Sequence, residues 1–260
     1  MRPSLLGLYA GLMCVFLLAP LAVAVVLSFS SGEKLDVPPP GYSLRWYAAA
    51  ASTEQFVTGL RVSTVIAAFT ALVSTIAGTA AAIAINHYRF RGRGLVQGFV
   101  MLPLAMPWVV IGLGILFTLG FYGLRPGNTA AVLGHSVIGI PYVTYLVLAT
   151  LSNYDITLEQ ASLNLGATRW QTFRDITLPL IAPGVLAGAI SAFLVSFDNV
   201  GISLFITRSD TLPLRLMQYI QFYANPSVAA VSTFLVSLSL VAVMITGRVL
   251  RRRDLDALGR

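Results

Sequence analysis

The residues able to support redox, nucleophilic or acid–base chemistry are few. The chain holds one cysteine, two histidines and one lysine. Cys14 lies within an apolar run, so it forms neither an intrachain disulfide nor a CxxC motif for a metal or for redox exchange. Lys34 is not in a Gly-Lys-Ser/Thr sequence, so the chain lacks a loop that cradles the phosphates of ATP. We therefore expect that this chain is not an enzyme and binds no metal or cofactor itself.

An acidic side chain within an apolar segment is the next candidate. Asp198 is the one acidic residue well inside an expected membrane span, and Asn199 follows it. A carboxylate there costs on the order of 2.5–3.5 kcal/mol on insertion scales. Asp198 either attracts a cation into a water-filled path or bonds to Ser196 and Asn199 and fixes helix packing. His135, near the outer end of another span, is expected to be hydrogen-bonded locally.

Composition indicates which elements must position these residues. Of the 260 residues, 57% are hydrophobic and only 10% are charged, which is too little polar surface to cover a water-soluble globule. Several apolar stretches reach the roughly 20 residues that a helix needs to cross a bilayer. We expect one all-α integral membrane domain over residues 1–260. Its six or so transmembrane helices are expected at 5–27, 62–85, 95–120, 131–151, 183–206 and 227–249.

The N-terminal part of the chain needs two further interpretations. The first apolar run contains Ala22-Val23-Ala24, a pattern that a signal peptidase can recognise, but it is longer than the usual signal segment of about 7–15 residues. We expect it to remain as the first helix. Residues 28–61 should form an external loop and an interfacial helix, because Trp46 and Tyr47 suit the headgroup layer.

Prolines and glycines mark places where these helices should bend or approach one another. Pro103 and Pro107 each remove a backbone hydrogen bond, so helix 95–120 is expected to bend or break near them. Backbone groups freed at membrane depth must be satisfied by protein or by cavity water. The break is therefore either a lining of the translocation path or a plain structural kink. The Gly94-x3-Gly98 and Gly184-x3-Gly188 spacings fit close packing, but among 22 glycines they arise readily by chance.

Basic residues predict the orientation of the chain in the membrane. With six spans, 11 of the 17 basic residues fall on the side of the two termini and 6 on the other side. Both termini are therefore expected in the cytoplasm. The basic residues lie in short loops between apolar runs, so nucleic-acid binding is not expected despite a net charge of +7.

The expected cytoplasmic segment 153–179 is the most informative part of the sequence. It reads as two short helices. Asp155 or Thr157 can cap the first helix, and Gly166 can end it in a left-handed conformation. Thr168 can cap the second helix.

The second short helix carries an apolar face. Trp170, Phe173 and Ile176 share this face, and Pro179 is expected to end the helix. The face either packs on the chain's own helices or docks into a groove of a soluble partner.

This segment resembles the cytoplasmic loop of the membrane subunits of binding-protein-dependent ABC importers. That family carries a Glu-Ala-Ala-x3-Gly-x9-Ile-x-Leu-Pro motif. The positions that match its spacing are Gln160, Ala161, Ser162, Gly166, Ile176, Leu178 and Pro179. Gln160 replaces the usual Glu and Ser162 replaces the second Ala, while Glu159 stands one position early. The long spacing makes the match specific despite these departures.

The resemblance covers nearly the whole chain and points to the spermidine/putrescine branch. The segments that carry it are 102–107, 135–142, 196–199, 211–215 and 225–233. It implies a type I ABC importer permease fold in the bacterial inner membrane, forming half of a path for a small solute, most plausibly a polyamine. It also implies a second permease subunit, a periplasmic solute-binding protein, and two ATPase subunits that bind ATP and Mg²⁺.

Within this resemblance, eight loop residues act in docking to the ATPase: Glu159, Gln160, Ala161, Ser162, Gly166, Ile176, Leu178 and Pro179. The candidate path residues are Pro103, Pro107, Asp198 and Asn199. A permease for another small solute is the nearest alternative, because related permeases carry various solutes. A self-contained secondary transporter is the other, but it would need several intramembrane ionisable groups or an internal repeat.

Overall fold

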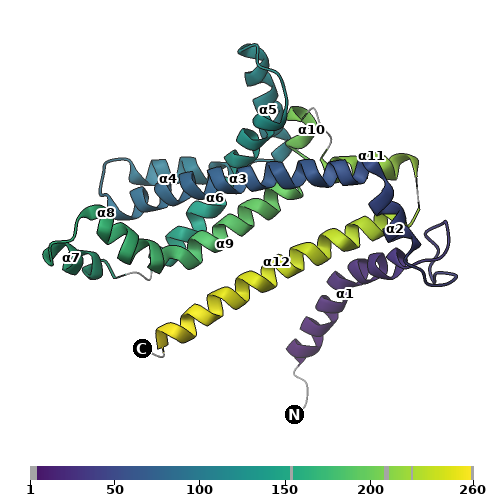
Figure 1. The fold of residues 1–260 in the computed structure, drawn as a ribbon, viewed down its shortest axis with the longest axis horizontal. Coiled ribbons are helices and arrows are strands. Elements are labelled where there is room, and N and C mark those ends of the chain that lie inside the picture. Colours follow the sequence, from purple (N-terminus) through teal and green to yellow (C-terminus); the bar gives the residue numbers. More distant parts are fainter. Residues whose placement is uncertain (1–4, 153–154, 208–210, 224, 259–260) are drawn as a thin grey trace. The chain divides into compact units, whose positions relative to one another are not determined.

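A computed structural model describes the backbone of residues 5–152, 155–207, 211–223 and 225–258. Apart from one isolated antiparallel bridge between Ser30 and Tyr42, the regular elements in these ranges are helices. They are α1 (Leu5–Ser28), α2 (Arg45–Ser52), α3 (Glu54–His87), α4 (Arg93–Met101), the 3-10 turn η1 (Leu102–Ala105), α5 (Trp108–Phe121), α6 (Asn128–Leu151), α7 (Thr157–Asn164), α8 (Arg169–Thr172), the π turn η2 (Phe173–Thr177), α9 (Leu178–Phe197), α10 (Ser203–Ile206), α11 (Leu212–Phe222) and α12 (Ser227–Leu258) (Figure 1). Residues 153–154 of the expected loop, and the side chains of the C-terminal arginines, lie outside the description.

The expected all-α membrane fold is confirmed. In the described ranges, four helices are long and apolar enough to cross a membrane: α1, α3, α6 and the helix that runs from Arg169 to Phe197. The segment 93–105 and α5 form a fifth span when this bent pair is counted as one. The sixth expected span, 227–249, falls within α12, whose described apolar part, Ser227–Val241, is shorter than a span.

Several expected helix limits differ from the structure. α3 begins at Glu54 rather than 62, one residue after the end of α2. The carboxylate of Glu54 favours a helix start there, because a negative charge stabilises the N-terminus of a helix. The fifth expected helix ends at Phe197 rather than 206. There the Asn199 Oδ1 accepts the backbone N–H of Ile202 at 2.8 Å and holds a turn before α10. α11 lies between the fifth and sixth expected helices.

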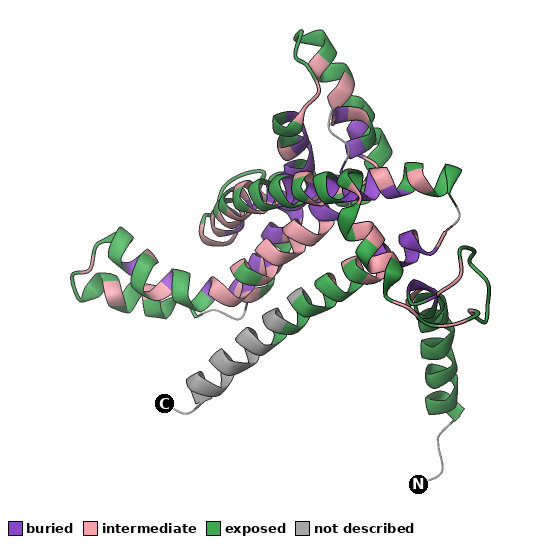
Figure 2. Cartoon of the chain, turned by 45° about the vertical axis from the view of Figure 1, so that its right-hand side comes forward, coloured by how far each residue is buried: buried purple, intermediate pink, exposed green. Residues whose placement is uncertain are grey.

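The chain divides into two compact units, formed by residues 1–59 with 215–241 and by 60–214 with 242–260. In the first unit, α1 is exposed along most of its apolar length (Figure 2). The expected short helix after the external loop is present as α2. It holds the loop in place, because the Trp46 Nε1 and the Arg45 Nη2 both donate to the carbonyl of Gly32, at 3.1 and 3.0 Å.

The second unit is built on the contact between α6 and α9. A Cβ atom added to Gly188 would lie 2.9 Å from the Cα of Val143, and one added to Gly184 would lie 2.8 Å from the carbonyl oxygen of Leu146. The Gly184-x3-Gly188 spacing therefore marks a true close approach, although it carried little weight as a pattern. By contrast, Gly94 and Gly98 have open space around them.

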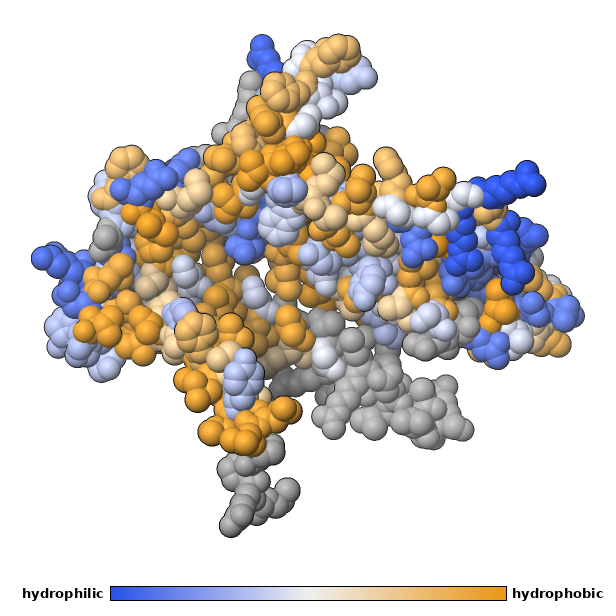
Figure 3. All heavy atoms as spheres, turned by 180° about the vertical axis from the view of Figure 1, so that it is seen from behind, coloured by the Kyte–Doolittle hydropathy of each residue, from blue (hydrophilic) through white to orange (hydrophobic). Residues whose placement is uncertain are grey.

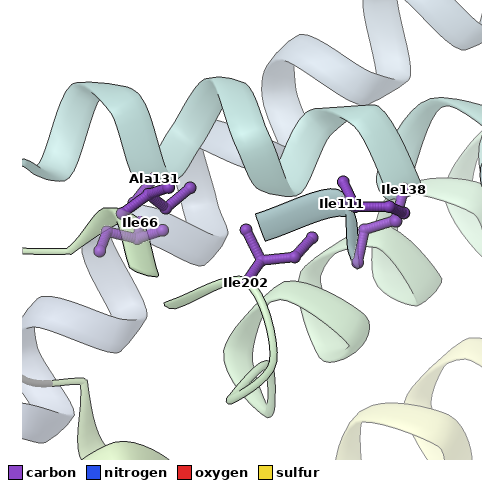
Figure 4. Close-up of a cluster of buried hydrophobic side chains, with 6 residues drawn as sticks. Ile66, Ile111, Ala131, Ile138 and Ile202 are labelled. Carbon is purple, nitrogen blue, oxygen red and sulfur yellow. The ribbon is translucent and has the colours of Figure 1, made fainter. Parts of the chain in front are cut away.

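Two apolar clusters fill the interior of this unit. The first joins α3, α5, α6 and the segment around α10, and its buried residues are Ile66, Ile111, Ala131, Ile138, Ile202 and Ile206 (Figure 4). The second joins α3, α6 and α9, with Ala82, Val143, Val147, Leu151, Ile181 and Ala192. Together they fix α3, α6 and α9 as a scaffold for the loop at one end and the turn after α9 at the other.

The expected break of the third helix is confirmed. The segment 93–105 and α5 are bent by 106° relative to each other (Figure 1). Pro103 lies in η1, and Pro107 is the residue immediately before α5. Proline cannot donate a backbone hydrogen bond. These two prolines, four positions apart, therefore end one helix and start another.

Candidate functional site

The loop between α6 and α9 buries polar side chains on its inner side. The Glu159 Oε1 on α7 lies 3.0 Å from the His87 Nε2 and accepts a hydrogen bond from the Thr177 Oγ1 at 2.6 Å. One turn later on α7, the Ser162 and Thr172 hydroxyls are 3.0 Å apart. Thr172 and Thr177 are themselves buried. These contacts attach α7 to the end of α3 and to the start of α9.

The outer side of the same loop also presents apolar side chains. Leu165 is 90% exposed, Trp170 67% and Leu158 47%. Trp170 lies beside the half-buried Phe173, with a ring-centroid distance of 5.6 Å and ring planes tilted by 33°. Phe173 and Ile176 are half-buried, and Phe173 shares a hollow with Ile83 of α3, whereas Trp170 is exposed. Both uses that the sequence leaves open therefore apply to different parts of this face.

Local backbone preferences hold this loop in shape, as the sequence predicts. Gly166 has a φ of +89° and follows α7. Thr168 and Gln171 form a capping box, in which each side chain accepts a hydrogen bond from the other residue's backbone N–H. The Asp155 Oδ1 accepts the backbone N–H of Thr157 at 2.9 Å, and this bond lowers the pKa of Asp155 below its ordinary value.

The expected end of the second short helix at Pro179 is wrong. α8, η2 and α9 form one continuous helix from Arg169 to Phe197. Pro179 lies in the first turn of α9, where a missing backbone N–H is tolerated, and the wider π turn of η2 joins it to α8. Ile176 is half-buried in that π turn.

The motif positions divide between the two sides of the loop. Gln160 and Ala161 are exposed, Ser162 is half-buried, and Leu178 and Pro179 are exposed where α9 begins. Ser162, which departs from the motif, has a polar partner in Thr172. Figure 3 shows hydrophilic side chains gathered over the end of the second unit that carries α7 and α8, next to an apolar belt.

The candidate path residues are placed differently from the expectation. Asp198 directly follows α9 and is exposed, rather than lying well inside a span. Its two expected partners bond elsewhere: Ser196 to His135, at 2.8 Å, and Asn199 to the backbone of Ile202. Asn199 is fully buried.

The turn after α9 lies against the proline break. A Cβ atom on Gly201 would lie 3.1 Å from the Cβ of Trp108, the first residue of α5. Pro107 precedes Trp108, so the structure brings Pro107 near the turn that holds Asp198 and Asn199. Pro103, in η1, belongs to the other arm of the bend.

His135 is hydrogen-bonded locally, as expected. Its ring is fully buried, with the Nδ1 2.8 Å from the Ser196 hydroxyl and the Nε2 3.1 Å from the Ser203 hydroxyl. The contact ties α6 to α9 and α10. Sequence reasoning missed the other histidine, His87, whose position at the end of α3 beside an arginine-rich loop was the available signal. In the part of the chain that the structure describes, no group of three or more His, Cys, Asp or Glu side chains could hold a metal ion.

An all-α chain with several apolar spans and short helices at its hydrophilic end has the architecture of an integral membrane protein. The chain belongs to the family described as the binding-protein-dependent transport system inner membrane component, whose family model matches residues 74–254. It is therefore a multi-pass permease of the inner membrane and a component of an ABC importer, which is a transport protein rather than an enzyme.

Curated relatives agree with this assignment. The spermidine/putrescine transport system permease protein PotC of Haemophilus influenzae is 30% identical, over 92% of this chain and 93% of its own length. The putrescine transport system permease protein PotI of Escherichia coli is 32% identical, over 85% and 81%. The molybdenum transport system permease protein ModB of Haemophilus influenzae is 35% identical over a shorter match, 60% of this chain and 77% of its own.

A solved structure shows the same fold. The crystal structure of a bacterial ABC transporter involved in the import of the acidic polysaccharide alginate contains a chain that matches with a TM-score of 0.72. The match covers 94% of this chain and 95% of that one, at 18% identity. Identity at this level supports the fold alone, and the fold is that of an ABC importer permease.

Proposed function

We propose that this permease imports a polyamine and that its loop from Asp155 to Pro179 docks on an ATPase subunit. The observation that carries the docking role is the division of the loop into a buried polar side and an exposed apolar side, because exposed Leu and Trp side chains at a hydrophilic end need a protein groove to cover them. The likeness to PotC and PotI over most of the chain supports the polyamine.

The partners follow from the same proposal. A second permease subunit completes the path, two ATPase subunits bind ATP and Mg²⁺, and a periplasmic binding protein delivers the solute. The distribution of basic residues supports cytoplasmic termini and a cytoplasmic docking loop. A cysteine placed at Lys34 tests this orientation, because in intact cells a membrane-impermeant reagent should label it from outside; labelling only from the cytoplasmic side would invert the topology.

Uptake of labelled putrescine and spermidine tests the substrate. Cells that lack this gene should take up less of either polyamine than the parent strain, and expression of the full chain should restore uptake. Molybdate is the comparison solute, because ModB matches part of the chain at 35% identity. If expression of the chain restores molybdate uptake, and polyamine uptake is the same in every strain, the substrate is an oxyanion and not a polyamine.

The path role of the turn after α9 is also a proposal, supported by the exposed carboxylate of Asp198 beside the proline break. An Asp198→Asn variant keeps the size of the side chain and removes its negative charge. We expect polyamine uptake to fall by roughly tenfold, since charge lining a path raises the local concentration of a cation by 10-fold or more. Normal polyamine uptake by this variant would contradict the path role, and Asn199, which holds the turn, would then serve structure alone.

A further inference from the structure

We infer that Glu159 is a positioning residue that connects the docking loop to α3 through His87. The inference rests on the proposed docking role of the loop. Glu159 was grouped with the docking residues on sequence alone, yet its side chain is only 15% exposed and points away from the apolar surface. Gln160, its neighbour, takes the exposed position.

One carboxylate oxygen of Glu159 serves three elements at once. It lies on α7, contacts the His87 Nε2 at the end of α3, and accepts the hydroxyl of Thr177 just before α9. Hydrogen bonds to an ionised carboxylate are about twice as strong as neutral ones, and burial strengthens them further. A movement of α7 is therefore communicated directly to the cytoplasmic ends of α3 and α9.

Packing around this contact is incomplete. A cavity of about 360 Å³ lies beside it, and its lining includes Ile83 of α3, Leu163 of α7 and Arg169 of α8. Apolar side chains of α7 therefore do not fill the space against α3, and the polar contact supplies the mechanical connection between the two helices. Arg169 is the other charged group that faces this space.

Ser162 provides a matched contact on the same side of α7. It is three residues after Glu159 and bonds to Thr172 at the end of α8, so it holds α7 and α8 together without reaching α3. A Ser162→Ala variant, which restores the residue usual in the motif, should therefore leave the connection to α3 intact. It serves as the control for removal of a hydrogen bond within the loop.

The test uses the complete transporter in proteoliposomes, with putrescine transported and ATP hydrolysed measured together. In Glu159→Ala we expect putrescine transported per ATP to fall by roughly tenfold, the effect of losing a hydrogen bond to a charged group. ATPase subunits should remain bound, because the apolar surface is unchanged. Glu159→Gln should retain much of the coupling, since its amide oxygen can still accept hydrogen bonds from both His87 and Thr177.

A double-mutant cycle with His87→Ala tests whether His87 is the partner of Glu159. It also provides a second variant of the same contact in case Glu159→Ala folds poorly. The double variant should be no worse than Glu159→Ala alone, as expected for a shared contact. Additive losses, or an unchanged ratio of putrescine to ATP in Glu159→Ala, would overturn the inference. Loss of ATPase subunits from Glu159→Ala would also overturn it, by showing that Glu159 acts in docking. If Trp170→Ala keeps its ATPase subunits at full affinity, the docking proposal itself fails.

Discussion

Replacing Gly166 with aspartate is expected to abolish uptake and to leave the chain in the membrane. Gly166 has a φ of +89°, and nothing lies within 4 Å of where its Cβ would be, so the variant meets strain but no clash. A left-handed residue with a side chain costs about 1–2 kcal/mol, which a helical membrane scaffold tolerates. The new charge, however, stands next to the exposed Leu165, in the surface that we propose docks on the ATPase.

Gly166→Asn is the matched control for this variant. Asparagine has the same shape and tolerates the left-handed conformation, but carries no charge. We expect Gly166→Asn to keep most uptake, whereas Gly166→Asp should lose both uptake and co-purifying ATPase subunits. The measurements are uptake, chain content of the membrane fraction, and ATPase recovered in mild detergent. Unchanged uptake in Gly166→Asp would count against the coupling role of the loop.

The second large effect is expected at the contact of α6 and α9. A Gly188→Ala change places a methyl group 2.9 Å from the backbone of Val143, so the two helices must separate. Overpacking of this kind typically costs about 1–3 kcal/mol, and membrane helices depend on such close contacts because lipid offers no hydrophobic drive for association. We expect a lower thermal-unfolding midpoint in detergent and less intact chain.

Gly94→Ala is the control, because it introduces the same methyl group into the other Gly-x3-Gly sequence. Gly94 has open space around it, so its substitution should leave the midpoint unchanged. Combining Gly184→Ala with Gly188→Ala should destabilise the chain further, since Gly184 faces the carbonyl of Leu146. Equal midpoints for Gly188→Ala and Gly94→Ala would show that the α6–α9 contact is looser than the structure indicates.

The sequence predicted those features that depend on local preference. Membrane helices follow from runs of apolar residues, the break of the third helix from Pro103 and Pro107, and the shape of the loop from Gly166 and Thr168. Each of these rests on residues close together in the chain. Such effects act in the same way wherever the segment lies.

Features that depend on distant contacts were not predictable in the same way. Glu159 meets His87, which is 72 positions away, and no local pattern indicates that meeting. The Gly184-x3-Gly188 spacing cannot be told from chance in the sequence, because its partner surface on α6 lies far away in the chain. Pro179 was expected to stop a helix, but a π turn before it lets the helix continue, and the hydrogen-bond shift of such a turn has no simple sequence signal.

Because this helix is continuous, it connects the loop directly to the turn after α9. The single helix from Arg169 to Phe197 has 29 residues, so it is about 44 Å long at 1.5 Å per residue. Trp170 stands at one end and the turn with Asp198 follows the other. α9 accounts for 20 of these residues, or about 30 Å, so a tilt of about 10° around its loop end would displace its far end by about 5 Å. If the loop docks on an ATPase subunit as proposed, a small rotation there would move the turn that holds Asp198 by an amount comparable to the width of a small solute.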